Sequence, residues 1–246
     1  MSRQTLLHSR SATSGPGVVL LASLLAACTP DDTDDPSTEP VPAYGPLHCP
    51  VGRAEVEARV EAILGELTLE QRASLMHGVA PLPLDGVWQS TAILQVGVPG
   101  LRMLDGPKGV GGSALLNLGT GDPTTCFPAA IGRGATWDVD LERQVGAAIG
   151  GELRASGGDT LLAPVVNVAW HPQGGRVQEG YGEDPWLVGQ LGSAFVRGVQ
   201  DAVAVAVAKH FTANHVENTR LDMSANLPPV TLHHTALPAF REVVQQ

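Results

Sequence analysis

The run Thr160-Leu161-Leu162-Ala163-Pro164-Val165-Val166-Asn167-Val168 decides the fold class of this chain. Its residues are mostly apolar and do not alternate with polar ones, which is typical of a strand buried on both faces. A polar, glycine-rich loop follows, then a helix expected over 186–199, then a second apolar run at 203–208. Strand, helix and strand in this order predict an α/β fold with a parallel sheet.

The same alternation extends to both sides of this unit. Thr68 and Gln71 have the spacing of a capping box, which predicts the start of a helix there. Asp184 followed by Pro185 predicts the start of the helix over 186–199. The remaining expected elements are helices over 55–64, 69–76 and 141–155, strands over 101–104 and, more weakly, 129–135, and a last helix from near Thr231 to Gln246.

The N-terminus has the pattern of an export signal. Arg3 and Arg10 precede about ten apolar residues at 18–27, a run too short to cross a bilayer but of signal-peptide length. The run ends in Leu25-Ala26-Ala27-Cys28, which resembles the lipobox of bacterial lipoproteins; an ordinary cleavage site with an incidental cysteine is the alternative. We expect a signal peptide over 1–27, lipidation of Cys28, and a lipid-anchored location in the bacterial cell envelope, periplasmic or on the outer surface.

Residues 28–50 are acidic and rich in proline, so they cannot bury enough apolar surface to fold and are expected to form a disordered tether. The folded domain is therefore expected over 51–246. Cys49 and Cys126 are the other two cysteines. In an oxidising envelope they could pair or remain two free thiols, and the sequence leaves both open.

Composition and motifs exclude several classes of function. The net charge is −10 and the chain has no basic stripe, which argues against nucleic acid as a partner. No Gly-x-Gly-x-x-Gly follows the first strand and no phosphate-binding loop occurs, so no cofactor is expected. The eight histidines do not fall at metal-ligand spacing, so no metal is expected either. Gly-x-Ser-x-Gly is also absent, which argues against a serine hydrolase.

Polar residues collect where the predicted strands end. Asp105 follows one apolar run, Arg176 and Glu179 lie in the loop after another, and Lys209 with His210 follow a third. The carboxyl ends of parallel strands meet at one edge of a sheet and commonly carry the chemistry. Taken singly, each has a plainer explanation, such as turn initiation by Asp105. Together, a lysine and a histidine aim several donors at one point, which suits the hydroxyls of a sugar.

Taken in order, these segments resemble glycoside hydrolase family 3, the β-glucosidase group. The resemblance covers residues 67–246, nearly all of the folded part. The matching segments are Leu67 through Gly78, Val98 through Pro107, Phe127 through Asp138, the loop Gly-Arg-x-x-Glu-x-x-x-Glu-Asp-Pro at 175–185, and Lys209-His210-Phe211 with Ala213-Asn214.

The resemblance implies a fold and a set of substrate contacts. The fold would be a partial (β/α)8 TIM-type barrel, about the first half of the family's N-terminal domain. The residues that would bind the terminal sugar, in the subsite before the scissile bond, are Asp105, Arg176, Lys209 and His210, with Glu179 in the matching loop. The chain departs from the family at two positions that affect how one sugar hydroxyl is recognised. Gly111 stands where an Arg is common, and Lys108 stands where a His is usual and could substitute for the missing contact.

The resemblance also implies a reaction that this sequence does not complete. Retaining glycosidases need two carboxyl groups about 5–5.5 Å apart. The family's nucleophile is an Asp in a Ser-Asp-Trp-like motif and its acid/base is a Glu in a following domain; neither motif occurs here, so both are expected beyond Gln246. The whole enzyme would release terminal β-D-glucosyl residues from oligosaccharides, while this chain would hold the sugar-binding half of the site, fold poorly alone and be inactive.

Two other functions stay open at this point. The same family includes β-N-acetylhexosaminidases, whose members read Lys-His-Phe-Pro-Gly-His-Gly where this chain has Lys209 through His215. The second is a non-catalytic surface lipoprotein that binds sugars. An in-frame continuation of the gene with Ser-Asp-Trp would favour the enzyme.

Overall fold

A computed structural model describes residues 52–79, 88–111 and 123–246. The signal peptide, the tether, Cys28 and Cys49 predicted from the sequence lie outside these residues. The thiol of Cys126 is exposed and free. Within the described ranges, no helix combines the length and apolar character that a membrane span requires.

One sheet lies at the centre of the molecule, and its strands run in the order β1-β2-β3-β4. Strands β2, β3 and β4 are parallel, whereas β1 pairs with β2 in the antiparallel direction. The predicted α/β class with parallel strands is thus confirmed. The short strand β1 was not predicted, because two residues carry no readable periodicity. The bounds are β1 Trp88–Gln89, β2 Arg102–Asp105, β3 Thr160–Leu162 and β4 Val205–Ala206.

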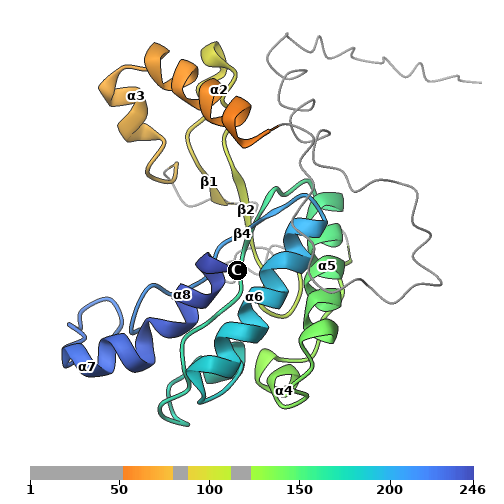
Figure 1. Ribbon diagram of the computed structural model, residues 1–246, viewed down its shortest axis with the longest axis vertical. Coiled ribbons are helices and arrows are strands. Elements are labelled where there is room, and N and C mark those ends of the chain that lie inside the picture. The colour runs from red at the N-terminus through yellow and green to blue at the C-terminus, as the bar shows by residue number, and fades with distance from the viewer. Residues whose placement is uncertain (1–51, 80–87, 112–122) are drawn as a thin grey trace, which may run out of the picture.

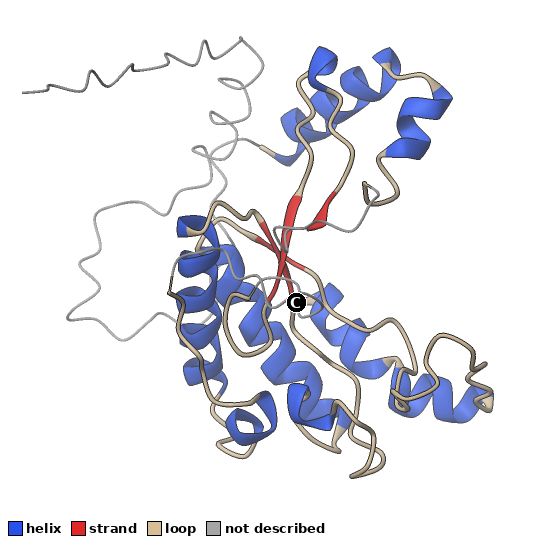
Figure 2. Cartoon of the chain, turned by 180° about the vertical axis from the view of Figure 1, so that it is seen from behind, coloured by secondary structure: helices blue, strands red, loops and turns tan. Residues whose placement is uncertain are grey.

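Three helices form a layer beside the sheet, with α6 in contact with both α5 and α8 (Figure 1). Seen from behind, the short strands cross at the centre and the helices α2 and α3 stand apart from this layer (Figure 2). The helices are α2 Arg53–Glu66, α3 Leu69–Ser74, α4 Ala130–Gly134, α5 Val139–Ala155, α6 Pro185–Asp201, α7 Pro229–Thr231 and α8 Pro238–Gln245, with short helical turns at Leu94–Val96, Val177–Glu179 and Leu232–Ala236.

The caps predicted from the sequence form as expected. Thr68 and Gln71 make both hydrogen bonds of a capping box at the start of α3. The Asp184 carboxylate accepts hydrogen bonds from the first backbone N–H groups of α6, and Pro185 occupies its first turn. These groups would otherwise lack partners at a helix start, which is why local sequence was enough to place both helices.

Two expectations about elements need correction. The strand expected over 129–135 is wrong, because this segment forms α4. It contains only one β-branched residue, Ile131, among alanines, glycines and an arginine, so little favours a strand. The single last helix expected from near Thr231 is instead α7, a π-helical turn and α8. Pro238, which cannot donate a backbone hydrogen bond, begins α8 and separates it from the turn.

The main core lies between the sheet and helices α5 and α6. Leu104 and Leu161 contribute from neighbouring strands, Ile149 from α5 and Phe195 from α6, and each of these side chains is fully buried. Burying such a side chain stabilises a fold by about 1.5–3 kcal/mol. This core fixes how β2 and β3 lie beside each other, and so where their carboxyl ends point.

Helices α5 and α6 approach closely because glycines line their contact. A Cβ atom added at Gly198 of α6 would lie 2.0 Å from the Arg143 carbonyl oxygen of α5. We expect Gly198→Ala to push the helices apart and to lower the free energy of unfolding by about 1–3 kcal/mol. Urea denaturation followed by circular dichroism measures this loss.

Gly151→Ala is the matched control, since Gly151 also lies in α5 but a Cβ atom added there would have no atom within 4 Å. Alanine suits a helix better than glycine by up to about 1 kcal/mol, so this variant should be neutral or slightly more stable. Equal denaturation midpoints for the two variants would contradict the close contact at Gly198.

Candidate functional site

The ends of β2 and β4 are joined by an ion pair between Asp105 and Lys209. Asp105 is the last residue of β2, and the register β2-β3-β4 places the segment after β4 nearby. The Lys209 Nζ donates to Asp105 Oδ1 at 2.7 Å. The lysine side chain is 14% exposed and the aspartate 40%, so solvent screens the pair only in part.

Arg176 and Glu179 form a two-point ion pair in the loop after β3. The Arg176 Nε and Nη2 donate to the two carboxylate oxygens of Glu179, each at 2.8 Å. Burial would raise the pKa of Glu179, but the hydrogen bonds and charge of Arg176 outweigh it, so this pKa is lowered. Two parallel hydrogen bonds fix the plane of the guanidinium, which a single contact would leave free to rotate.

His210 links this pair to the ends of the strands. Its Nε2 lies 2.8 Å from Arg176 Nη1. Since a guanidinium can only donate, His210 Nε2 accepts and the ring hydrogen resides on Nδ1. Burial, followed by the charges of Arg176 and Lys209, lowers the pKa of His210 to about 4. The imidazole is therefore neutral at neutral pH and can still donate through Nδ1.

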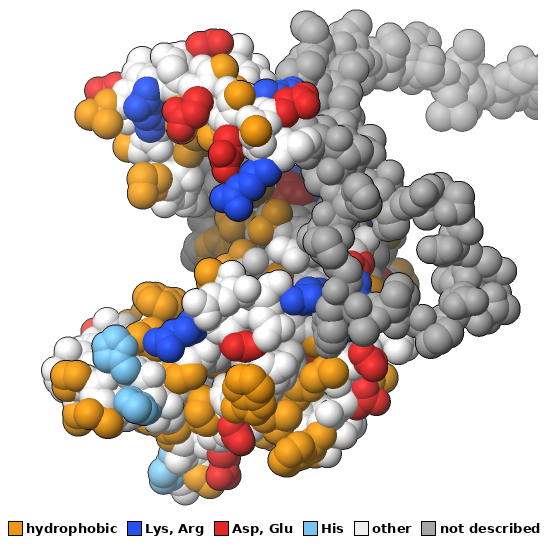
Figure 3. All heavy atoms as spheres, in the orientation of Figure 1, with side chains coloured by type: hydrophobic (Ala, Val, Ile, Leu, Met, Phe, Trp, Pro, Cys, Tyr) orange, Lys and Arg blue, Asp and Glu red, His pale blue; other side chains and the backbone are white. Residues whose placement is uncertain are grey.

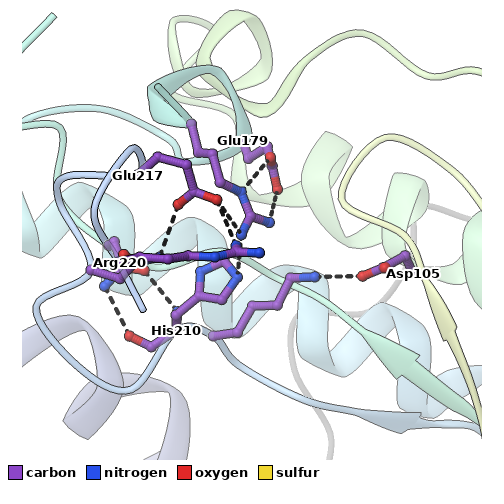
Figure 4. A network of polar contacts seen from close by, with 9 residues as sticks. Asp105, Glu179, His210, Glu217 and Arg220 are labelled. Atoms are coloured by element: carbon purple, nitrogen blue, oxygen red, sulfur yellow. Dashed lines mark hydrogen bonds and ion pairs between the residues drawn. The ribbon is translucent and has the colours of Figure 1, made fainter. Parts of the chain in front are cut away.

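Figure 4 shows the side chains of Asp105, Glu179 and His210 directed toward one another from separate segments of the chain. The structure thus brings Asp105, Arg176, Glu179, Lys209 and His210 into one place. Their role in binding a sugar stays a prediction. Arg176 and Lys209 carry positive charge, Asp105 and Glu179 negative charge, so these four groups balance.

The sixth predicted residue, Lys108, is not part of this cluster. Its side chain is exposed and makes no hydrogen bond or ion pair with any residue that the structure describes. The neighbouring turn instead supports Asp105 through the backbone, because the Gly111 N–H donates to the Asp105 carbonyl oxygen at 2.9 Å. The substitution of Lys108 for the family's usual contact therefore gains no support from geometry.

Three further residues join the cluster that the sequence did not assign to it. The Asn167 side chain bonds the main chain of His210, and Glu217 contacts both Arg176 and Arg220. Asn167 is the first polar residue after Thr160 in the apolar run that continues beyond β3, so its position near a strand end was an available signal. Nothing in the sequence spacing of Glu217 and Arg220 distinguished a place in the cluster from a position on the surface.

A narrow pocket adjoins the cluster and is open to solvent in part; its volume is about 20 Å³, room for about one water molecule. Arg176 and His210 line it together with Asn167, Trp170 and His215, whereas Asp105 and Lys209 do not. Within the described ranges, no three His, Cys, Asp or Glu side chains are grouped so as to hold a metal ion.

We expect the His210 imidazole to titrate with a pKa of about 4 rather than its ordinary 6.5. Since folding lowers this pKa, the neutral ring contributes stability in full above about pH 6.5, and the contribution is lost as the pH falls through about 4. Nuclear magnetic resonance of the ring, assigned by comparison with His210→Gln, measures it. A pKa near 6.5 would contradict the burial and the contact with Arg176.

Comparisons with known proteins agree in pointing to one family. A model described as the glycosyl hydrolase family 3 N terminal domain matches residues 97–246. A β-glucosidase of Rhizobium radiobacter is 39% identical over 188 residues, which are 76% of this chain and 22% of the relative. β-Glucosidase B of Emericella nidulans is 33% identical over 77% of this chain and 21% of its own length.

A solved structure gives the same result for the fold. β-Glucosidase 3B from Thermotoga neapolitana, in complex with α-D-glucose, superposes with a TM-score of 0.68 at 34% identity. The match covers 76% of this chain and 27% of that one. The chain spans about a fifth of the length of the curated relatives it matches.

Proposed function

Since this chain belongs to glycosyl hydrolase family 3 and matches the model of its N-terminal domain over residues 97–246, we propose that it binds the terminal β-D-glucosyl residue of an oligosaccharide or β-glucoside in a retaining β-glucosidase. One observation carries this proposal: Asp105, Arg176, Lys209 and His210, far apart in sequence, lie together at the strand ends. The names of the three relatives support the same substrate, and none of the three is a β-N-acetylhexosaminidase.

The cluster has the donors and acceptors that a sugar requires. A pyranose offers both a donor and an acceptor at each hydroxyl. Asp105 supplies a carboxylate acceptor, Lys209 and Arg176 supply charged donors, and His210 supplies the Nδ1–H of a neutral ring. Such hydrogen bonds contribute to catalysis when they strengthen in the transition state, where they supply several kcal/mol.

None of the three acids in the cluster is proposed as the catalytic nucleophile. Asp105 accepts a hydrogen bond from Lys209, Glu179 accepts two along one edge of Arg176, and Glu217 accepts one from Arg220. A nucleophile must direct a free oxygen at the sugar carbon, whereas both oxygens of Glu179 and one oxygen each of Asp105 and Glu217 already accept hydrogen bonds from cations. We infer that other residues supply the two catalytic carboxyl groups, and that the acids described here orient the donors.

We also propose that the sheet is part of a (β/α)8 barrel. Strand β4 forms one edge of the described sheet, and Val205 on it is 49% exposed. An apolar groove beside this edge is lined by residues of α6, of β4 and the segment after it, and of α8, including Val207, Phe211, Phe240 and Val243. Apolar side chains are also exposed over the helices, as Figure 3 shows on the face in view. Closure into a barrel would pair the edge and cover the groove.

For its location, we propose export and lipid attachment through Cys28. The support is the sequence pattern of two arginines, a short apolar run and Leu25-Ala26-Ala27-Cys28. In cells expressing the gene, labelled fatty acid should be incorporated into the protein and lost in Cys28→Ser. Equal labelling of both proteins would refute the anchor.

Glucose binding by the product of this gene tests the proposed function. We expect D-glucose to bind to a protein whose circular dichroism shows that it is folded, and N-acetylglucosamine to bind more weakly. The 246-residue chain alone should not hydrolyse an aryl β-glucoside, because each acid of its cluster is paired with a cation. A folded protein that does not bind glucose would overturn the proposal.

A further inference from the structure

Arg176 is held on three sides before any ligand arrives. A guanidinium has five N–H groups. The Nε and one Nη2 hydrogen of Arg176 face Glu179, and one Nη1 hydrogen faces His210 Nε2 at 2.8 Å. On the remaining side, Glu217 Oε1 lies 3.7 Å from Nη1. Few N–H groups of Arg176 are left for a ligand, so its direction is set by these neighbours.

Glu217 lies between two guanidinium groups. Its Oε1 accepts a hydrogen bond from Arg220 Nη1 at 2.5 Å, and Asn214 Nδ2 donates to its Oε2 at 3.3 Å. The Glu217 side chain is 26% exposed and that of Arg176 is 24% exposed. Without the carboxylate, the charges of Arg176 and Arg220 would repel each other, and solvent would screen this repulsion only in part, since Arg220 is 47% exposed and Arg176 24%. Glu217 therefore holds Arg176 toward His210 by both attraction and screening.

Asn167 holds the backbone of His210, the residue to which Arg176 donates. Its Oδ1 accepts from the His210 backbone N–H at 2.7 Å, and its Nδ2 donates to the His210 carbonyl oxygen at 3.1 Å. Two backbone hydrogen bonds lie just before this point, from the Lys209 N–H to the Pro164 carbonyl oxygen and from the Val166 N–H to the Lys209 carbonyl oxygen. The Asn167 side-chain amide thus extends the pairing of the two segments by one residue, in the way that a backbone peptide group would. It fixes the position of the His210 backbone, from which the ring extends.

We propose that Glu217 and Asn167 are positioning residues of the glucose site: Glu217 orients the guanidinium of Arg176, and Asn167 orients His210. The two act on a unit in which Arg176 donates to His210 Nε2, leaving Nδ1–H directed at the ligand. This inference rests on the proposed function for its ligand. Its structural half, the fixed tautomer of His210, does not require a sugar.

Glucose titration by calorimetry tests the first half. Glu217→Gln keeps the shape and removes the charge, and should weaken binding about tenfold, in the range of one charged hydrogen bond. In an Arg176→Lys background the same change should cost nothing more, because the group it orients is gone. Asp222→Asn, an exposed carboxylate in the same loop, is the control and should bind as the unchanged protein does.

Asn167→Ala is expected to weaken glucose binding to a similar degree, and its effect should disappear in a His210→Ala background. Equal losses with and without the partner residue would overturn the proposal, because they would mean that Glu217 or Asn167 acts on the fold in general. Full affinity in both single variants would overturn it as well.

The ring nitrogens of His210, followed by ¹⁵N nuclear magnetic resonance without sugar, test the second half. The unchanged protein should show Nδ1 protonated and Nε2 bare, whereas Glu217→Gln should show a mixture of tautomers. Identical spectra would refute the role of Glu217, even in a protein that binds glucose. If the unchanged protein shows the fixed tautomer and does not bind glucose, the proposed function fails while the orientation of His210 stands.

Discussion

Asp105→Ala is expected to lower the affinity for glucose by about 10²–10³-fold, the largest loss of binding among single changes in the cluster. The carboxylate is the acceptor at the end of β2, and its removal also leaves the Lys209 ammonium, 14% exposed, without its partner. Losing one side of a hydrogen-bonded charge pair costs about 2–5 kcal/mol, and each 1.36 kcal/mol is tenfold. Calorimetric titration with D-glucose measures the effect.

Two controls separate this loss from unfolding. Asp140→Asn removes an exposed carboxylate from the first turn of α5, away from the strand ends, and should leave affinity unchanged. Asp105→Ala should still melt in one cooperative transition above the temperature of the titration, even though the unpaired Lys209 lowers its stability. If Asp105→Ala binds glucose within a few fold of the unchanged protein, Asp105 does not touch the sugar.

Glu142→Ala should produce the largest loss of stability, about 3–5 kcal/mol. The Glu142 carboxylate is buried, binds the Arg133 guanidinium at 2.8 and 3.0 Å, and accepts from the Tyr181 hydroxyl at 2.7 Å. The Arg133 and Glu142 side chains are only 4% and 2% exposed. Removing one member of such a pair leaves a buried charge unpaired, which is strongly destabilising. Urea denaturation measures the loss.

Replacing both charges is the informative control. Arg133→Met combined with Glu142→Leu leaves no unpaired charge, so it should be more stable than Glu142→Ala alone. Arg133 also donates to the carbonyl oxygens of Pro128 and Pro107, and this loss remains in the double variant. A double variant less stable than Glu142→Ala would mean that these backbone contacts, rather than the charge pair, hold the region together.

The buried network also connects the stability of the fold to the site. Arg133 binds the carbonyl oxygen of Pro107, two residues after Asp105. Tyr181, two residues after Glu179, binds Glu142 on α5. The loops that carry both acids are thus tied to the same helix layer. Burial raises the pKa of Tyr181 well above its ordinary value, so its hydroxyl remains a donor to Glu142 at neutral pH.

Local signals explain what the sequence predicted well. The cap at Asp184 and the box at Thr68 satisfy backbone groups of their own helices, so neither depends on distant contacts. The apolar runs gave the parallel strands for a similar reason, since a strand buried on both faces has few alternatives. The placement of Asp105 and Lys209 at strand ends followed from these runs.

Other features depend on contacts that a single sequence does not reveal. Arg133 and Glu142 are nine residues apart and look like surface charges, yet both are buried because Tyr181 and the Pro128 carbonyl oxygen complete their hydrogen bonds. Segment 129–135 was expected to be a weak strand because its residues have only weak secondary-structure propensities. In the fold this segment forms α4, and Gly134 packs closely against the Tyr181 backbone. The role of Glu217 needs the distance to Arg176, which only the folded chain supplies.

A crystal structure of the gene product soaked with D-glucose tests the central claim most directly. The account predicts one pyranose within hydrogen-bonding distance of Asp105, Arg176, Lys209 and His210, with His210 Nδ1 facing a hydroxyl. A glucose bound elsewhere, or an empty cluster at saturating sugar, would contradict it.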